Sequence, residues 1–442
     1  MALATLALAV ILTAVACELE LELASWSGCL SLTSLGLWAV MAGNPLTLLL
    51  AWSALDITDL YILLRLLGRA DERKQAIYVF VTRVSGIFLI LFGFIFSSTK
   101  GILLQFDQVP IDLNIYLLLA TSLRLGVIPL HMTFWQEPPL RRGIGTVSRM
   151  TTVATSLVFL PRLAAAGVLE SQSVLLNIVI GVIALYAGFS WISAVNELEG
   201  RAFWILGMAA LSLAAAIRGQ PLPTLVWGVM LVFSGGLLFL YSARNRVLLL
   251  LPLLGVLGAV ALPFTPTWYA GQFFGPPFSL WQVVYLISYA LLLGGMLRHS
   301  LQPREDLVQM ERWVWVIYPL GLLLMVVSHY LAGWLGGTLL GDANWPINLG
   351  TVLPGLILLG LVMLVQFLVL RGFLMPQRWQ ATFGRVFSLI WFYNILGWFF
   401  TLIEKAFAFI TTVLEGDGGI LWALLLLTLL MAFLSQLGLA GG

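Results

Sequence analysis

Arg124, Gly126, Pro129 and His131 lie in one short stretch of an otherwise apolar segment, which combines a cation, two helix breakers and a titratable ring. If this segment crosses a membrane, every backbone polar group needs a partner inside the protein. A broken helix with a buried cation then survives only against protein or along a water-filled path. Ionisable side chains inside a membrane are costly and indicate a functional site by default. The stretch therefore predicts ion or proton handling rather than simple anchoring.

Three more charged residues lie in apolar segments earlier in the chain: Asp56, Asp59 and Arg83. A separation of three places both aspartates on one face of a helix. Together with Arg124 and His131 they form the candidate ion path, for which two interpretations stay open. In the first, the path is hydrated, Arg124 is a fixed cation that tunes an aspartate, and His131 titrates near neutral pH. In the second, Arg124 and an aspartate form a static buried ion pair, which is costly to break.

The composition identifies a membrane protein with many spans. Of the 442 residues, 61% are hydrophobic and 10% are charged, against about 25% charged in soluble domains. The net charge of +2 gives no reason to expect a nucleic-acid partner. Two cysteines and three histidines are too scattered to predict a disulfide framework or a metal site. No nucleotide-binding, catalytic-triad, haem or iron–sulfur motif occurs, so we predict no cofactor and no catalytic residue, and membership of a redox enzyme stays an open question.

Fourteen segments fit the length and hydropathy of a transmembrane helix, about 20 mostly apolar residues each. They cover residues 2–17, 24–42, 45–67, 75–97, 111–134, 147–167, 171–194, 201–217, 222–242, 247–270, 278–298, 313–335, 348–371 and 418–438. The first is expected to be an uncleaved helix rather than a lipoprotein signal, because it lacks a basic region at its start. The expected fold is therefore an all-α polytopic membrane protein.

Proline interrupts two of these segments, which stand five helices apart. Pro129 lies in the fifth, and Pro263 and Pro266 lie in the tenth. This separation suggests two five-helix repeats, the second inverted in the membrane, as in transporters with broken helices at matching positions. The alternative is that prolines are simply more common in membrane helices. The predicted domains are an N-terminal helix (1–23), a first repeat (24–167), a second repeat (171–298), two further helices (313–371), a lateral segment (376–415) and a last transmembrane helix (418–438).

The segment 376–415 differs from the others because it mixes charged and aromatic residues. Such a mixture fits an amphipathic helix that lies along the membrane surface or against neighbouring subunits. The alternative is one more tilted span over 386–403, which would move the C-terminus to the other side.

Lys and Arg concentrate in the loops that follow odd-numbered helices. By the positive-inside rule these loops are cytoplasmic, and both termini are then extracytoplasmic. The expected membrane is a bacterial inner membrane or an internal energy-transducing membrane.

The stretch from Arg124 to His131, followed by an aromatic residue and a Glu-Pro-Pro turn, resembles the Lys-x-Gly-x-x-Pro-Phe-His-x-Trp motif of the antiporter-like subunits of respiratory complex I. The same superfamily supplies subunits of multi-subunit sodium/proton antiporters and membrane-bound hydrogenases. Weaker similarities keep the family's order: Asn196-Glu197-Leu198, Pro263-Phe264-Thr265 and the segment 414–422. The resemblance implies other integral membrane subunits and lipid as partners, and a lateral helix before the last span.

The chain departs from the family at its functional lysines. The resemblance implies a lysine in each broken helix, paired with a carboxylate two helices earlier. The first position holds Arg124, which stays protonated in proteins, whereas a buried lysine can release its proton. The second position falls near Ala270, where Gln272 is the nearest polar residue, and Asp56 and Asp59 match the carboxylate position only with a small shift. These differences favour the static interpretation over full proton pumping.

The main prediction is an antiporter-like membrane subunit of a multi-subunit, complex I-like ion-translocating assembly, which contributes a partly degenerate proton path, scaffolds its neighbours, or both. One alternative is a self-contained proton- or sodium-coupled secondary transporter. A second is a proton-conducting partner of an inorganic-carbon uptake complex. The residues do not distinguish protons from sodium ions.

Overall fold

The computed structural model describes ten stretches of the chain and a few single residues between 376 and 408. The stretches are residues 1–17, 23–102, 104–106, 109–128, 142–242, 246–276, 278–302, 312–339, 347–372 and 419–436. These residues form helices, turns and irregular connections, and no strand. The chain divides into two compact units, Met1–Ala381 and Thr382–Gly442. The first unit holds every residue of the candidate site.

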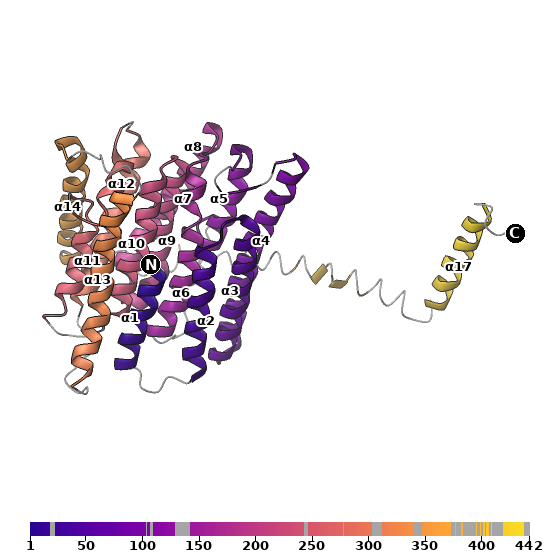
Figure 1. Cartoon of the computed structure of the whole chain (residues 1–442), viewed down its shortest axis with the longest axis horizontal. Coiled ribbons are helices and arrows are strands. Elements are labelled where there is room, and N and C mark those ends of the chain that lie inside the picture. The colour runs from indigo at the N-terminus through magenta and orange to yellow at the C-terminus, as the bar shows by residue number, and fades with distance from the viewer. Residues whose placement is uncertain are drawn as a thin grey trace. The chain divides into compact units, whose positions relative to one another are not determined.

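The first half of the large unit is a row of antiparallel helices (Figure 1). They are α1 (Ala2–Cys17), α2 (Leu23–Val40), α3 (Pro45–Leu66), α4 (Ala70–Thr99), α5 (Ile111–Leu125), α6 (Arg142–Leu157) and the short α7 (Leu160–Ala164). The second half continues with α8 (Glu170–Ser193), α9 (Glu197–Ile217), α10 (Pro221–Leu240), α11 (Leu250–Gly258), the 3-10 helix η1 (Trp268–Phe274), α12 (Leu280–Leu301), α13 (Val314–Leu339) and α14 (Leu349–Leu370). The second unit contains α17 (Gly419–Gln436).

Eight of the described helices are long and apolar enough to cross a membrane, which agrees with an all-helical membrane protein. They are α3, most of α4, most of α8, α9, α10, α12, most of α13 and α14. Three shorter apolar stretches lie in α1, α2 and α17. Most of the lateral segment predicted over 376–415 lies outside the described residues.

Three segments that the sequence predicts as single helices end early or are interrupted. The segment 147–167 is divided between α6 and α7, because Pro161 has no N–H for the helical hydrogen bond to Leu157. The segment 111–134 is helical only to Leu125 among the described residues. The segment 247–270 is helical only to Gly258 and turns into η1 ten residues later, with Pro263 and Pro266 in between.

The interruption after α11 is a defined structure. The Thr267 hydroxyl donates to the Gly258 carbonyl at 2.8 Å and accepts from the Ala261 N–H at 2.9 Å. Ala261 and Phe264 adopt positive φ values of 56° and 67°, a backbone conformation that is strained for residues other than glycine. Hydrogen bonds from one side chain therefore replace part of the backbone ladder that the prolines remove.

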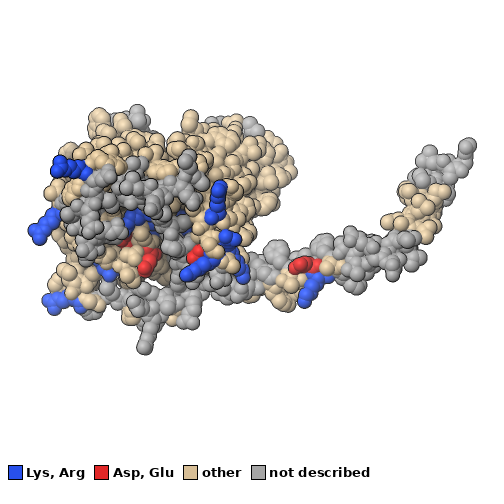
Figure 2. Space-filling view, turned by 90° about the horizontal axis from the view of Figure 1, so that it is seen from below, with Lys and Arg blue, Asp and Glu red and all other residues tan. Residues whose placement is uncertain are grey.

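The core of the large unit is built around α6, α9 and α10. All residues of α6 from Gly143 to Leu157 are buried. In an apolar stretch of 18 residues in each helix, 94% of the residues are buried in α9 and 83% in α10, against 17% in α14. Helix α1 packs on α2, α6, α10 and α13. Successive helices alternate in direction, except that the short α7 continues α6. The connections 67–69 and 194–196 therefore lie at one end of the bundle, the lower end in Figure 1, and 41–44 and 165–169 lie at the upper end. Seen from below, the lower face carries Lys and Arg around a few acidic residues (Figure 2).

Candidate functional site

Helix α3 carries both aspartates on its buried face. A capping box fixes the start of the helix: the Asn44 side chain accepts from the Thr47 N–H at 2.8 Å, directly before Pro45 at the first helical position. Asp56 and Asp59 are each 1% exposed, and their separation of three residues places them on one face. The helix therefore brings two carboxylates into the interior of the bundle.

Arg124 lies in the last turn of α5, which ends directly after it. Gly126 has φ 78°, and the Val127 N–H donates back to the Ser122 carbonyl at 2.8 Å, the hydrogen-bond pattern of a helix that ends with a left-handed glycine. A cation near a helix C-terminus is stabilised by the helix dipole. The Arg-x-Gly sequence therefore places the guanidinium at a helix end inside the protein.

Helices α4 and α5 approach closely where Gly86 faces Arg124. A Cβ atom at position 86 would lie 2.9 Å from the Ala120 carbonyl oxygen and 2.9 Å from Arg124 Cγ, closer than real Cβ contacts. Arg83, one turn earlier on α4, is 3% exposed, and its carbonyl oxygen accepts from the Arg124 guanidinium at 3.3 Å. The missing side chain at Gly86 therefore allows Arg124 to lie against α4.

Arg124 and Asp56 form a bidentate ion pair. One guanidinium nitrogen lies 2.5 Å from Asp56 Oδ2 and another lies 3.0 Å from Oδ1. Arg124 Nε donates to the Ser156 hydroxyl at 3.3 Å. Paired N–H donors matched to the two oxygens of a carboxylate make this the strongest common type of protein ion pair.

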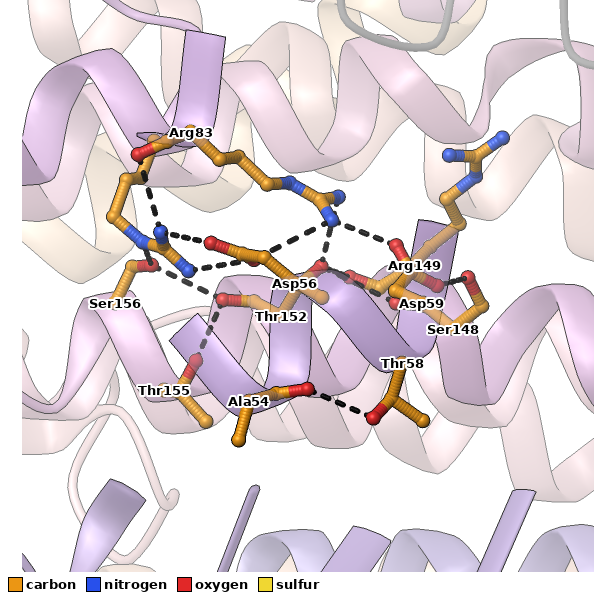
Figure 3. Close-up of polar contacts among 11 residues, drawn as sticks. Ala54, Asp56, Thr58, Asp59, Arg83, Ser148, Arg149, Thr152, Thr155 and Ser156 are labelled. Atoms are coloured by element: carbon orange, nitrogen blue, oxygen red, sulfur yellow. Dashed lines mark hydrogen bonds and ion pairs between the residues drawn. The ribbon is translucent and has the colours of Figure 1, made fainter. Parts of the chain in front are cut away.

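Arg83 and Asp59 form the second ion pair, one turn along α3. Arg83 Nη1 lies 2.7 Å from Asp59 Oδ2 and 3.8 Å from Asp56 Oδ1. Helix α6 completes the pair: the Ser148 hydroxyl donates to Asp59 Oδ1 at 2.5 Å, and Arg83 Nη2 donates to the Thr152 hydroxyl at 3.2 Å (Figure 3). Arg83 therefore links the two aspartates.

Trp52 covers the open face of the Arg124 guanidinium. The guanidinium carbon lies 4.1 Å from the centre of the indole ring, and Trp52 is fully buried, one turn before Asp56 on α3. A desolvated cation–π contact of this kind contributes on the order of 2 kcal/mol. Arg124 therefore has protein partners both in the plane of its guanidinium and on one face.

Asp56, Asp59, Arg83 and Arg124, which we call the charge quartet, are two acidic and two basic side chains in mutual contact. Each aspartate has an arginine nitrogen within hydrogen-bond distance. Arginine does not release its proton in proteins, and a carboxyl group that took up a proton would weaken charge-assisted hydrogen bonds to a buried guanidinium. The quartet can hold charge in place, but its arginines cannot replace a lysine that releases and rebinds a proton.

Some predicted site residues cannot be placed with the quartet. Pro129 and His131 lie outside the described residues, and Pro263 and Pro266 lie in the interruption between α11 and η1. Across the described part of the chain, no group of three or more His, Cys, Asp or Glu side chains is arranged to hold a metal ion.

Sequence reasoning did not find a further ion pair, between the partly exposed Arg142 and the buried Glu197. Arg142 begins α6, and its guanidinium lies 2.6 Å from the fully buried Glu197 carboxylate on α9. It also donates to the Phe239 and Tyr241 carbonyls at the end of α10, at 3.2 and 3.5 Å. Both residues lie within predicted loops, where hydropathy gives no sign of burial, so the sequence offered no signal for the pair. The contact ties the first half of the bundle to the second.

No protein-family model matches the chain, and no curated protein matches it. Solved structures do match. A chain of the Mrp complex from Dietzia sp. DQ12-45-1b superposes with a TM-score of 0.68 at 13% identity, over 92% of this chain and 51% of that one. This chain therefore spans about half the length of the Mrp chain.

Two respiratory membrane complexes also contain similar chains. A chain of the membrane-bound sulfane sulfur reductase, an archaeal respiratory membrane complex, superposes with a TM-score of 0.68 at 11% identity, over 98% of this chain and 87% of that one. A chain of respiratory complex I from Thermus thermophilus gives 0.56 at 15% identity, over 76% and 85%.

These structures define the class of fold. The fold that this chain shares with them agrees with the resemblance of the motif around Arg124. The protein is an all-helical membrane protein with the fold found in chains of these complexes. At identities of 11–15% the likeness establishes the fold alone.

Proposed function

We propose that the chain is an antiporter-like membrane subunit of a multi-subunit, ion-translocating assembly, and that its first half retains a degenerate proton path in which the charges are fixed. Its role is then to hold neighbouring subunits and to keep a buried ion network at the position where the family has a titrating lysine. The fold shared with chains of the Mrp complex, the sulfane sulfur reductase and complex I supports the assembly part of this proposal.

The bidentate pair between Arg124 and Asp56 carries the fixed-charge part of the proposal. A carrier must release its proton in one state and bind it in another, and a buried lysine can do so. The Arg124 guanidinium cannot, and its contacts to Asp56, Ser156 and the Arg83 carbonyl hold it in one place. The quartet therefore acts as a static network that joins α3, α4, α5 and α6.

The second broken region supports the same conclusion. Helix η1 reads Trp-Tyr-Ala-Gly-Gln-Phe-Phe and contains no charged residue. Ala270, nearest to the family's second lysine, is fully buried. A proton that reached the second half would find no cationic carrier in this helix.

The remaining parts of the proposal concern architecture. We place the two repeats at 24–167 and 171–298 and assign the segment 376–415 to contacts with neighbouring subunits. Both termini would face away from the cytoplasm, in a bacterial inner membrane or an internal energy-transducing membrane. Other integral membrane subunits and lipid are the partners, and any redox centre belongs to a partner.

The conduction part is tested with the chain purified alone and reconstituted in liposomes. A potassium diffusion potential drives protons, and an internal dye reports pH. We expect no proton flux above that of protein-free liposomes, because the quartet's arginines cannot act as carriers; an added uncoupler shows that the driving force is present. Flux in the wild-type chain that disappears in Asp56→Asn would show a working path and contradict the proposal.

The alternatives predict other outcomes. A self-contained secondary transporter would be stable without partners and would couple proton or sodium flux to a solute. A proton-conducting partner of an inorganic-carbon uptake complex would conduct protons only when assembled. Neither has a specific structural observation in its favour.

A further inference from the structure

Three aromatic rings connect Arg124 to the upper end of the bundle. The Trp52 ring, which covers the Arg124 guanidinium, meets the Phe159 ring edge-to-face with 6.0 Å between centres. Phe159 meets Phe106 in the same manner at 5.0 Å. The Arg162 guanidinium then covers Phe106, 4.8 Å from the ring centre. A continuous column of rings thus lies between two arginines.

The column comes from three separate parts of the chain and reaches the upper connections. Trp52 belongs to α3, Phe159 follows α6, and Phe106 lies between α4 and α5. Their exposed fractions are 0%, 1% and 8%. The Arg162 guanidinium donates to the Ala42 carbonyl at 2.7 Å, in the connection between α2 and α3. The rings therefore fill the space between the charge quartet and that end of the protein.

The surroundings of the quartet toward the lower end are different. Helix α6 carries polar residues at intervals from Arg142 to Ser156. The four residues from Leu157, the last of α6, to Leu160, the first of α7, are apolar. Ser148 binds Asp59, and Arg149 lies nearby on α6 (Figure 3). Farther down, the Arg142 side chain is 22% exposed. Polar side chains therefore continue along α6 from the quartet to a partly exposed arginine toward the lower end.

We propose that Trp52, Phe159 and Phe106 form an aromatic seal that closes the charge quartet to water from the upper end. A buried water needs two to four polar partners, and ring faces offer few. The Trp52 ring also takes the place of water on the open face of the Arg124 guanidinium. Exchange of water or ions with the quartet then takes place from the lower end. The seal does not depend on the proposed subunit role.

The test measures how fast a thiol beside Arg124 reacts with a small, charged, membrane-impermeant methanethiosulfonate reagent in sealed membrane vesicles of each orientation. The background is the full chain with Cys17→Ser and Cys29→Ser. Ser156→Cys places the thiol in the site, and Lys100→Cys, at an exposed position beside the start of the α4–α5 connection, identifies vesicles with the upper end outside.

In those vesicles we expect the thiol of Ser156→Cys to be almost unreactive. Adding Phe159→Ala to this variant should raise the labelling rate of the thiol by an order of magnitude or more. Phe273→Ala is the matched control, because it truncates an equally buried ring packed on Trp227 in the second half. It should leave the rate unchanged. Phe159→Leu, a milder truncation with an effect in the same direction, replaces Phe159→Ala if that variant does not assemble.

Three results would overturn the seal: rapid labelling of Ser156→Cys with the rings intact, no increase with either Phe159 variant, or an equal increase with Phe273→Ala. The labelling rate is independent of transport. Proton flux through the wild-type chain would contradict the proposed function and leave the labelling result standing.

Discussion

Arg124→Ala will lower the free energy of unfolding by about 3–5 kcal/mol, because it leaves the buried Asp56 carboxylate without its bidentate partner. Asp56→Ala will have a similar cost, since it leaves the Arg124 guanidinium buried without that carboxylate. The double variant will cost clearly less than the sum of the two, because residues in direct contact are not additive. SDS titration of the purified proteins in mixed micelles measures the free energy of unfolding of the two single variants and the double variant.

The exposed ion pair between Lys100 and Asp112 is the matched control. Its N–O distance is 3.5 Å and its side chains are 41% and 62% exposed, so each alanine variant should cost less than about 1 kcal/mol. If the Arg124 and Asp56 variants cost no more than these, or if their effects add, the quartet is not the buried, mutually dependent network described here.

Arg124→Lys will also destabilise the protein, although it introduces the lysine of the motif that this stretch resembles. A lysine ammonium cannot make the bidentate contact to Asp56 or reproduce the planar stacking on Trp52. It would also leave the Ser156 hydroxyl or the Arg83 carbonyl with one contact fewer. We expect a loss of about 1–3 kcal/mol, the range for unsatisfied buried polar groups, in the same titration.

Arg65→Lys is the control for the replacement of an arginine by a lysine, because Arg65 is an exposed residue on the same helix as Asp56. It should change stability by no more than about 0.5 kcal/mol. An Arg124→Lys protein as stable as the wild type would mean that the site accepts a lysine without rearrangement. The fixed-charge interpretation would then lose its physical basis.

The residues of the quartet could be found from the sequence because charge inside an apolar span is rare and easily recognised. The spacing of Asp56 and Asp59 correctly placed both on one helix face. The division of partners could not be predicted: Arg124 binds Asp56 and Arg83 binds Asp59 because of the distances between helices, which one sequence does not contain. Gly86, which permits the close approach of α4 and α5, carried no signal of its own.

The helices were predicted best where hydropathy is continuous and worst where polar residues are buried. Helix α6 starts at Arg142 rather than at 147. Its first residues, Arg-Gly-Ile-Gly-Thr, resemble a loop in composition, although those from Gly143 to Thr146 are buried. Helix α4 starts at Ala70 rather than at 75, since its first turns are charged and lie beyond the apolar stretch. Trp52 and Ser148 were missed for a related reason: their roles depend on a neighbouring helix.

Mass spectrometry of the complex that co-purifies with the tagged chain tests the central claim most directly. The chain is extracted from its native membrane in a mild detergent, and the co-eluting proteins are identified and quantified. The account predicts several different integral membrane subunits in a fixed ratio to this chain. A chain that elutes alone or only with copies of itself, stable and folded, would contradict the claim that it is a subunit of a larger membrane assembly.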